Sequence, residues 1–195
     1  MKTSSKYFTV LLAALALTPM LAQAHPNHGA ASFANGLAHP LTGFDHLLAM
    51  VAVGLWAVQL GGRAVWTVPL TFVSVMTLGA VLGMSGMALP FVETGILASV
   101  LILGVLVAAS VRLPLAVSTA VVGVFALAHG HAHGAEMPVN ASGFVYALGF
   151  AGTTALLHLT GIGWGLAMKH FATTTVIRYT GGSIAALGVY LCLAA

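Results

Sequence analysis

The sequence predicts an all-α membrane protein, a bundle of six transmembrane helices that follows a cleaved signal peptide. Of the 195 residues, 59% are hydrophobic and 5% are charged, whereas ordinary soluble domains carry roughly 25% charged residues. So few charges exclude a soluble enzyme, and the high hydrophobicity excludes a disordered chain. The apolar stretches are also too long and too uniform for the alternating strands of a membrane barrel. The net charge of +3 gives no sign of nucleic-acid binding.

Residues 1–24 have the pattern of a secretory signal peptide. Lys2 and Lys6 form a basic start, an apolar core follows, and the tripeptide that ends at Ala24 matches an A-x-A cleavage site. The apolar core is shorter than the roughly 20 residues that cross a bilayer. We therefore expect cleavage after Ala24, which leaves a single transmembrane domain of residues 25–195. An uncleaved first membrane helix is the alternative.

Beyond residue 35, six apolar stretches are separated by short breaks that contain a charge, a proline or paired glycines. Such breaks are typical of the places where a chain leaves the bilayer. The predicted spans are residues 40–60, 65–88, 91–110, 113–130, 142–168 and 174–194. Glycines four residues apart, Gly79 with Gly83 and Gly161 with Gly165, indicate tight packing between helices.

The charges predict how the chain is oriented in the membrane. All basic residues beyond the signal peptide fall in or beside the first, third and fifth breaks: Arg63, Arg112, Lys169 and Arg178. The second and fourth breaks contain Glu93 and Glu136 instead. Because cytoplasmic loops are enriched in Lys and Arg, the basic breaks are predicted to be cytoplasmic. This predicts an even number of spans and a mature N-terminus on the outer side of the membrane.

The first candidate site combines two histidines and a carboxylate at the start of the first span. If Pro40 occupies the first helical turn, His39 and His46 lie two turns apart on one face, about 10 Å along the axis. Asp45 lies beside that face. A carboxylate inside a membrane helix costs at least about 2.5–3.5 kcal/mol, so it needs a partner. These groups could hold a divalent cation; the alternative is an Asp45–His pair that links two helices.

The second candidate site is the motif His129-Gly-His131-Ala-His133-Gly-Ala-Glu136 at the outer end of the fourth span. A short histidine-rich tract is typical of metal binding. If the helix continues, spacings of four and three put His129, His133 and Glu136 on one face. The two glycines of the motif also allow a frayed or looped backbone, and a solvated polar loop is the alternative to a metal site.

The third candidate is His158, in the middle of the fifth span, at a depth similar to that of Asp45 and His46. A lone membrane histidine can also serve only as a hydrogen-bonding group between helices. Several imidazoles with one or two carboxylates suit Ni²⁺ or Co²⁺, and Zn²⁺, Fe²⁺ and Cu²⁺ stay open. Cys192 is the only cysteine of the sequence, which excludes a cysteine cage for zinc. No prosthetic group is expected.

The motifs His39-Pro-x-x-Gly43-x-Asp45-His46-x-x-x-Met50, His129-Gly-His-Ala-His-Gly-Ala-Glu136 and Leu157-His158-x-x-Gly161 together resemble the HupE/UreJ family. Its members are small bacterial membrane proteins, associated with nickel-containing hydrogenases and ureases, that are regarded as nickel or cobalt permeases. The resemblance covers essentially the whole mature chain. It implies a secondary transporter and no enzyme, with Ni²⁺ or Co²⁺ as cargo and a functional link to a hydrogenase or urease. The positions carried over as metal-binding are His39, Asp45, His46, His129, His131, His133, Glu136 and His158.

The expected mechanism collects cations at His39 and the region His129–Glu136, then passes them to a central site around Asp45, His46 and His158. The sequence contains no GxxxxGK[ST] phosphate loop, so ATP hydrolysis is not expected to drive this movement. Other classes stay open. They are an intramembrane zinc-dependent hydrolase with Asp45 or Glu136 as base, a haem-binding electron carrier, and an assembly factor that moves no ions. A homo-oligomer also stays open.

Overall fold

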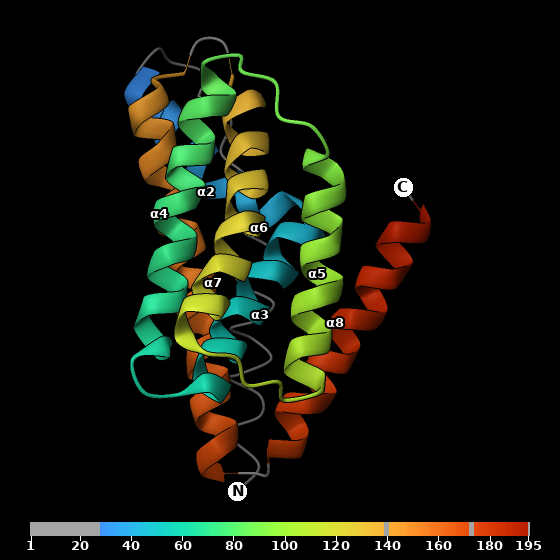
Figure 1. The fold of residues 1–195 in the computed structure, drawn as a ribbon. Coiled ribbons are helices and arrows are strands. Elements are labelled where there is room, and N and C mark those ends of the chain that lie inside the picture. Colours follow the sequence, from blue (N-terminus) through green and yellow to red (C-terminus); the bar gives the residue numbers. More distant parts are fainter. Residues whose placement is uncertain (1–27, 139–140, 172–173, 195) are drawn as a thin grey trace, which may run out of the picture.

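The computed structural model describes residues 28–138, 141–171 and 174–194, and these residues form seven helices with their connections (Figure 1). The helices are α2 (His28–Thr42), α3 (Phe44–Leu60), α4 (Ala64–Met84), α5 (Val92–Ala108), α6 (Leu115–Ala135), α7 (Gly143–Phe171) and α8 (Thr174–Ala194). The predicted all-α class is confirmed. The predicted signal peptide, residues 1–24, lies outside the described residues.

The helices α4, α6, α7 and α8 are long and apolar enough to cross a membrane. The pair α2 and α3 passes the same test together as a fifth candidate, although it bends by 82° at the break around Gly43. Helix α5 is apolar but has only 17 residues. The described residues therefore form a multi-pass membrane protein with four or five candidate spans by length and composition, and the count of six stays a prediction.

The predicted span 40–60 corresponds to α3, but the prediction that Pro40 lies in the first turn of this helix is wrong. Helix α2 begins upstream at His28, and Pro40 lies near its end instead of in the first turn of a new helix. A Cβ added to Gly36 of α2 would lie 2.2 Å from the carbonyl oxygen of Tyr146 in α7. Only glycine allows this approach, which packs α2 closely against α7.

Helix α7 has 29 residues and lies beside α2 with its first half and beside α3 with its second half (Figure 1). Thr153 donates a hydrogen bond to the carbonyl of Leu37 in α2, at 2.8 Å. Further along, Gly54 of α3 packs closely on the backbone of α7 at His158 and Gly161. The predicted packing role of Gly161 is thereby confirmed, and the broken pair α2–α3 follows α7 along its length.

Helices α4 and α6 run parallel and touch through glycines of both. These are Gly79 and Gly83 in α4, and Gly130 and Gly134 in α6. A Cβ added to any of them would lie between 1.9 and 2.5 Å from a carbonyl oxygen of the other helix. The predicted packing of Gly79 and Gly83 is confirmed. Because α6 continues as a helix through Ala135, the alternative of a frayed or looped histidine motif is wrong.

Basic and acidic residues gather at opposite ends of the bundle. At one end, Lys169 donates a hydrogen bond to the carbonyl of Val58, and Arg178 Nε donates to the carbonyl of Ala108 at 2.9 Å. Arg63 and Arg112 line one pocket at the same end. At the other end, Glu93 and Glu136 line a second pocket. The basic and acidic breaks of the sequence therefore lie at opposite ends of the helix bundle.

Candidate metal site

A pocket of about 200 Å³ lies toward the acidic end of the bundle. Residues from α2, α3, α5 and α6 line it. Those able to bind a cation are His39, Asp45, His46, Glu93, His133 and Glu136. The fold thus brings the first predicted motif and the outer part of the second motif to one place.

Four imidazole rings follow one another inward from this pocket. Glu136 Oε2 lies 3.1 Å from Nε2 of His39, the first ring. The ring centroids of His39 and His133 are 4.8 Å apart, those of His133 and His46 are 4.5 Å apart, and those of His46 and His129 are 4.7 Å apart. His129 and His133 are fully buried, at 0% exposure. We call these four residues the histidine row.

The predicted arrangement of His39 and His46 on one helix face is wrong, because the chain breaks at Gly43 between α2 and α3. The two rings come together by contacting His133 from different helices. A Cβ added to Gly43 would lie 2.6 Å from Asp45 Oδ1 and 3.1 Å from His46 Nδ1. The bare glycine therefore makes room for the pair that begins α3.

His46 has the hydrogen-bond pattern of a metal-binding histidine. Asp45 Oδ1 accepts the backbone N–H of His46 at 2.7 Å and lies 2.7 Å from its Nδ1. An ionised carboxylate only accepts, so Nδ1 carries the ring proton and Nε2 carries the free lone pair. This Nε2 is buried and makes no hydrogen bond within the part of the chain that the structure describes. A carboxylate behind a histidine is the usual support for a metal ligand.

His129 is oriented in the same way by Ser99 of α5. The Ser99 hydroxyl donates its single proton to the carbonyl of Ile96 at 2.6 Å, and its oxygen lies 2.9 Å from His129 Nε2. Since that proton is already used, His129 Nε2 is the donor to Ser99, and Nδ1 keeps the free lone pair. Sequence reasoning missed Ser99, because a serine in an apolar helix carries no signal of its own.

Five imidazole nitrogens on four histidines are buried without a hydrogen-bond partner among the described residues. They are His46 Nε2, His129 Nδ1, His133 Nδ1, His133 Nε2 and His158 Nε2. A buried polar atom left without a partner costs about 1–3 kcal/mol, and such atoms are uncommon in native proteins. Several such nitrogens in one region are therefore unusual, and the hydrogen bonds within the fold do not account for them.

His158 connects to the histidine row through Phe72 of α4. The ring centroid of Phe72 lies 5.6 Å from that of His129 and 5.1 Å from that of His158. His158 Nδ1 donates to the carbonyl of Met50 at 2.8 Å, which leaves its Nε2 lone pair free. Phe72 is fully buried. Sequence reasoning missed it, because phenylalanine is an ordinary residue of apolar helices.

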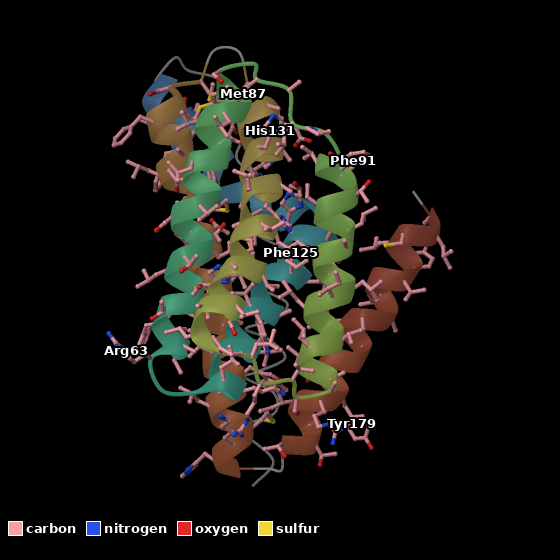
Figure 2. All side chains as sticks on the ribbon, in the orientation of Figure 1. Arg63, Met87, Phe91, Phe125, His131 and Tyr179 are labelled. Carbon is pink, nitrogen blue, oxygen red and sulfur yellow. The ribbon has the colours of Figure 1, made fainter. Side chains whose placement is uncertain are left out.

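The structure does not bring His131 to the other predicted ligands. Its Nε2 donates a hydrogen bond to the carbonyl of Met87, at 2.7 Å, beyond the end of α4. Figure 2 shows His131 beside Met87 at one end of the molecule, opposite the end with Arg63. His131 is two residues from both His129 and His133, so it projects from the opposite side of α6.

Among the described residues, no three His, Cys, Asp or Glu side chains are arranged so that they could hold one metal ion. The ligand groups instead form neighbouring pairs along a row. Such an arrangement suits an ion that exchanges ligands as it moves, since conduction needs several sites that each bind the ion weakly enough to release it.

Fold and site together define a multi-pass helical membrane protein whose interior carries a row of histidines with free lone pairs. The chain matches the HupE / UreJ protein family over residues 12–191 and therefore belongs to the HupE/UreJ family. It is 50% identical to Protein HupE of Rhizobium leguminosarum bv. viciae over 185 aligned residues. The alignment covers 94% of this chain and 95% of that protein. No solved structure matches it. The family is associated with nickel and cobalt uptake and consists of transporters and not of enzymes.

Proposed function

We propose that this chain is a permease that imports Ni²⁺, or Co²⁺, across the bacterial inner membrane by secondary transport. One observation carries the proposal. The histidine row presents buried imidazole nitrogens that have no hydrogen-bond partner among the described residues, and it leads inward from a pocket lined by carboxylates. Imidazole with a few carboxylates suits these ions, and the family association points to the same cargo. The imported metal would supply a nickel enzyme of the hydrogenase or urease type.

The proposed topology has six spans, in which the bent pair α2–α3 is the first and α5 the third. The 17 residues of α5 extend about 25 Å, close to the roughly 30 Å of hydrocarbon. The basic end faces the cytoplasm, since cytoplasmic loops are enriched in Lys and Arg. The pocket with Glu93 and Glu136 then opens to the periplasm, where the N-terminus lies after cleavage of the signal peptide.

On this topology the cation first meets Glu93 and Glu136, whose negative charges raise its local concentration. His39, His133, His46 and His129 then offer ligand nitrogens in succession, and Asp45 offsets the positive charge of the ion. Phe72 offers no ligand atom and separates the histidine row from His158, which receives the ion on the inner side. His131 takes no part in this path.

Uptake of labelled nickel into metal-starved cells tests the proposal. Asp45→Ala and His46→Ala should each abolish uptake, because the first removes the partly buried carboxylate and the second removes the imidazole that this carboxylate orients. Arg178→Ala, at the opposite end of the molecule, should leave uptake close to that of the unaltered protein at equal expression. Unchanged uptake in both the Asp45 and His46 variants would refute the path.

The alternative of an intramembrane zinc-dependent hydrolase is less well supported. A catalytic zinc needs three protein ligands on one ion and an open fourth position. The described side chains form successive pairs, and the family consists of transporters. Turnover of a lipid ester or amide by the purified, zinc-loaded protein would favour the hydrolase.

A further inference from the structure

A second polar pocket, of about 280 Å³, lies at the basic end of the bundle, far from the histidine row. It is formed between two connections of the chain, one joining α3 to α4 and the other joining α5 to α6. Each connection contributes one arginine, Arg63 and Arg112 respectively, and the remaining lining is glycine, alanine and leucine. Within the described residues neither guanidinium has a hydrogen bond or an ion pair. The pocket is therefore positively charged, and the part of the chain that the structure describes supplies no counter-ion.

Buried side chains of α3 hold the pocket in shape. Trp56, fully buried, donates from Nε1 to the carbonyl of Val111 at 2.9 Å, directly beside Arg112. Gln59 donates to the carbonyl of Val107 at 2.9 Å and to Ser110 Oγ at 3.3 Å. These bonds tie the α5–α6 connection to α3. Arg112 is thus presented from a fixed backbone and not from a loose loop.

The other wall of the pocket leaves open space next to Arg63. Gly61 and Gly62 adopt φ angles of +75° and +53°, and a Cβ added to either would meet no atom within 4 Å. The parallel helices α4 and α6 also begin here, at Ala64 and Leu115, without a side-chain cap. The positive ends of these two helix dipoles add to the potential of the two arginines. Open space, two arginine charges and two helix N-termini therefore meet at the edge of the apolar part of the molecule.

We propose that this pocket binds the phosphate group of an anionic phospholipid. The geometry favours a lipid over a free anion because Leu60, Leu113 and Leu115 line the same pocket and can contact the start of the acyl chains. Arginine pairs with phosphate oxygens through two parallel hydrogen bonds, and basic pockets between transmembrane helices bind anionic head groups. The site lies apart from the metal path and does not depend on the proposed transport.

Native mass spectrometry of the full-length protein in non-ionic detergent tests the proposal, with phosphatidylglycerol added and phosphatidylcholine as the zwitterionic comparison. Arg63→Gln and Arg112→Gln should each weaken phosphatidylglycerol binding about fivefold or more, from the contribution of one basic residue near an anionic membrane. Arg178→Gln is the matched control. It removes one positive charge from the same end, but outside the pocket, and should keep the affinity of the unaltered protein.

Several results would overturn the proposal. An equal loss of phosphatidylglycerol binding in all three variants would mean that the lipid is attracted to the whole basic end and not to a defined site. If phosphatidylcholine binds as well as phosphatidylglycerol, the pocket binds acyl chains and does not distinguish the head groups. Displacement of the lipid by inorganic phosphate at the same concentration would mean a site for a free anion. Because both arginines are exposed, the thermal unfolding of the lipid-free variants, followed by tryptophan fluorescence, should match that of the unaltered protein.

Discussion

Three inward-facing histidines each donate a hydrogen bond from one ring nitrogen to an acceptor within the protein. The other ring nitrogen of each histidine therefore keeps its lone pair. The acceptors are the Asp45 carboxylate for His46, the Ser99 hydroxyl for His129 and the Met50 carbonyl for His158. A neutral imidazole has one proton to donate. The hydrogen bonds of the protein itself therefore fix the tautomer of these rings.

This arrangement predicts a measurable role for Ser99, which binds no metal itself. Ser99→Ala removes the acceptor that orients His129 and should weaken Ni²⁺ binding by about 10-fold or more, as loss of such supporting partners usually does. Ser118→Ala is the control, because Ser118 is equally buried but bonds only to backbone carbonyls at the far end of α6. Titration of the purified proteins with Ni²⁺ gives the affinities. Equal affinity of the two variants would contradict the role.

The contrast between His131 and His133 gives a second prediction at this scale. His133→Ala removes a ring that contacts both His39 and His46, so nickel uptake should fall at least tenfold. His131→Ala breaks only the bond to the Met87 carbonyl and should keep more than half of the uptake. Labelled nickel accumulation at matched expression distinguishes them, and a loss in the His131 variant as large as in the His133 variant would place His131 on the path.

At the level of single residues, sequence identifies the histidines and Asp45 because polar groups are rare in apolar helices and conspicuous there. It also indicates that His129, His133 and Glu136 share a face, since their spacing fits a helix. It does not identify Ser99 or Phe72. Both are ordinary residues of membrane helices, and only the packing of α5 and α4 against α6 and α7 gives them their positions.

Among the elements, most helix positions follow from runs of apolar residues and the breaks between them, but α2 does not. Its sequence, His28–Thr42, is rich in small residues and contains Pro40, which local rules assign to a helix start. In the structure, Pro40 instead lies near the end of a helix that packs on α7 through Gly36. The bend at Gly43 cannot be predicted from local sequence either, although it places His46 beside His133 and not two turns from His39 on the same helix face.

The glycine contacts between α4 and α6 predict which substitution disturbs the site from a distance. Gly130→Val would press a side chain against the backbone of α4, since a Cβ there lies 1.9 Å from the Met76 carbonyl oxygen. Overpacking of this kind costs typically 1–3 kcal/mol or more, and separation of the helices also displaces His129. The thermal unfolding midpoint of the purified protein should fall by several degrees.

Gly123→Val is the control for this substitution, in the same helix. There the nearest atom to an added Cβ is Val75 Cγ2 at 3.9 Å, an ordinary van der Waals contact. Its unfolding midpoint should stay near that of the unaltered protein. If both variants lose the same stability, the cause is the β-branched side chain itself and not the close approach of the two helices.

For the whole molecule, the opposite charges of the two ends fit one direction of travel. Carboxylates line the pocket that we propose as the entrance, and arginines and a lysine lie at the far end. A cation is attracted to the acidic entrance, whereas the basic end matches the side that faces anionic lipids and the cytoplasm. In the proposed orientation the protein needs no hydrolysed nucleotide, because the membrane potential acts on the charge of the ion.

The membrane potential determines how strongly the ion can be accumulated inside the cell. At about 100 mV, negative inside, each elementary charge gains about 2.3 kcal/mol, so a divalent ion gains about 4.6 kcal/mol, enough for roughly 10³-fold accumulation without a coupled ion. A protonophore should therefore collapse nickel uptake. Valinomycin with high external K⁺, which removes the potential and leaves the pH gradient, should collapse it equally. Uptake that survives the K⁺ clamp and stops only when the pH gradient is removed would show instead that protons drive the transport.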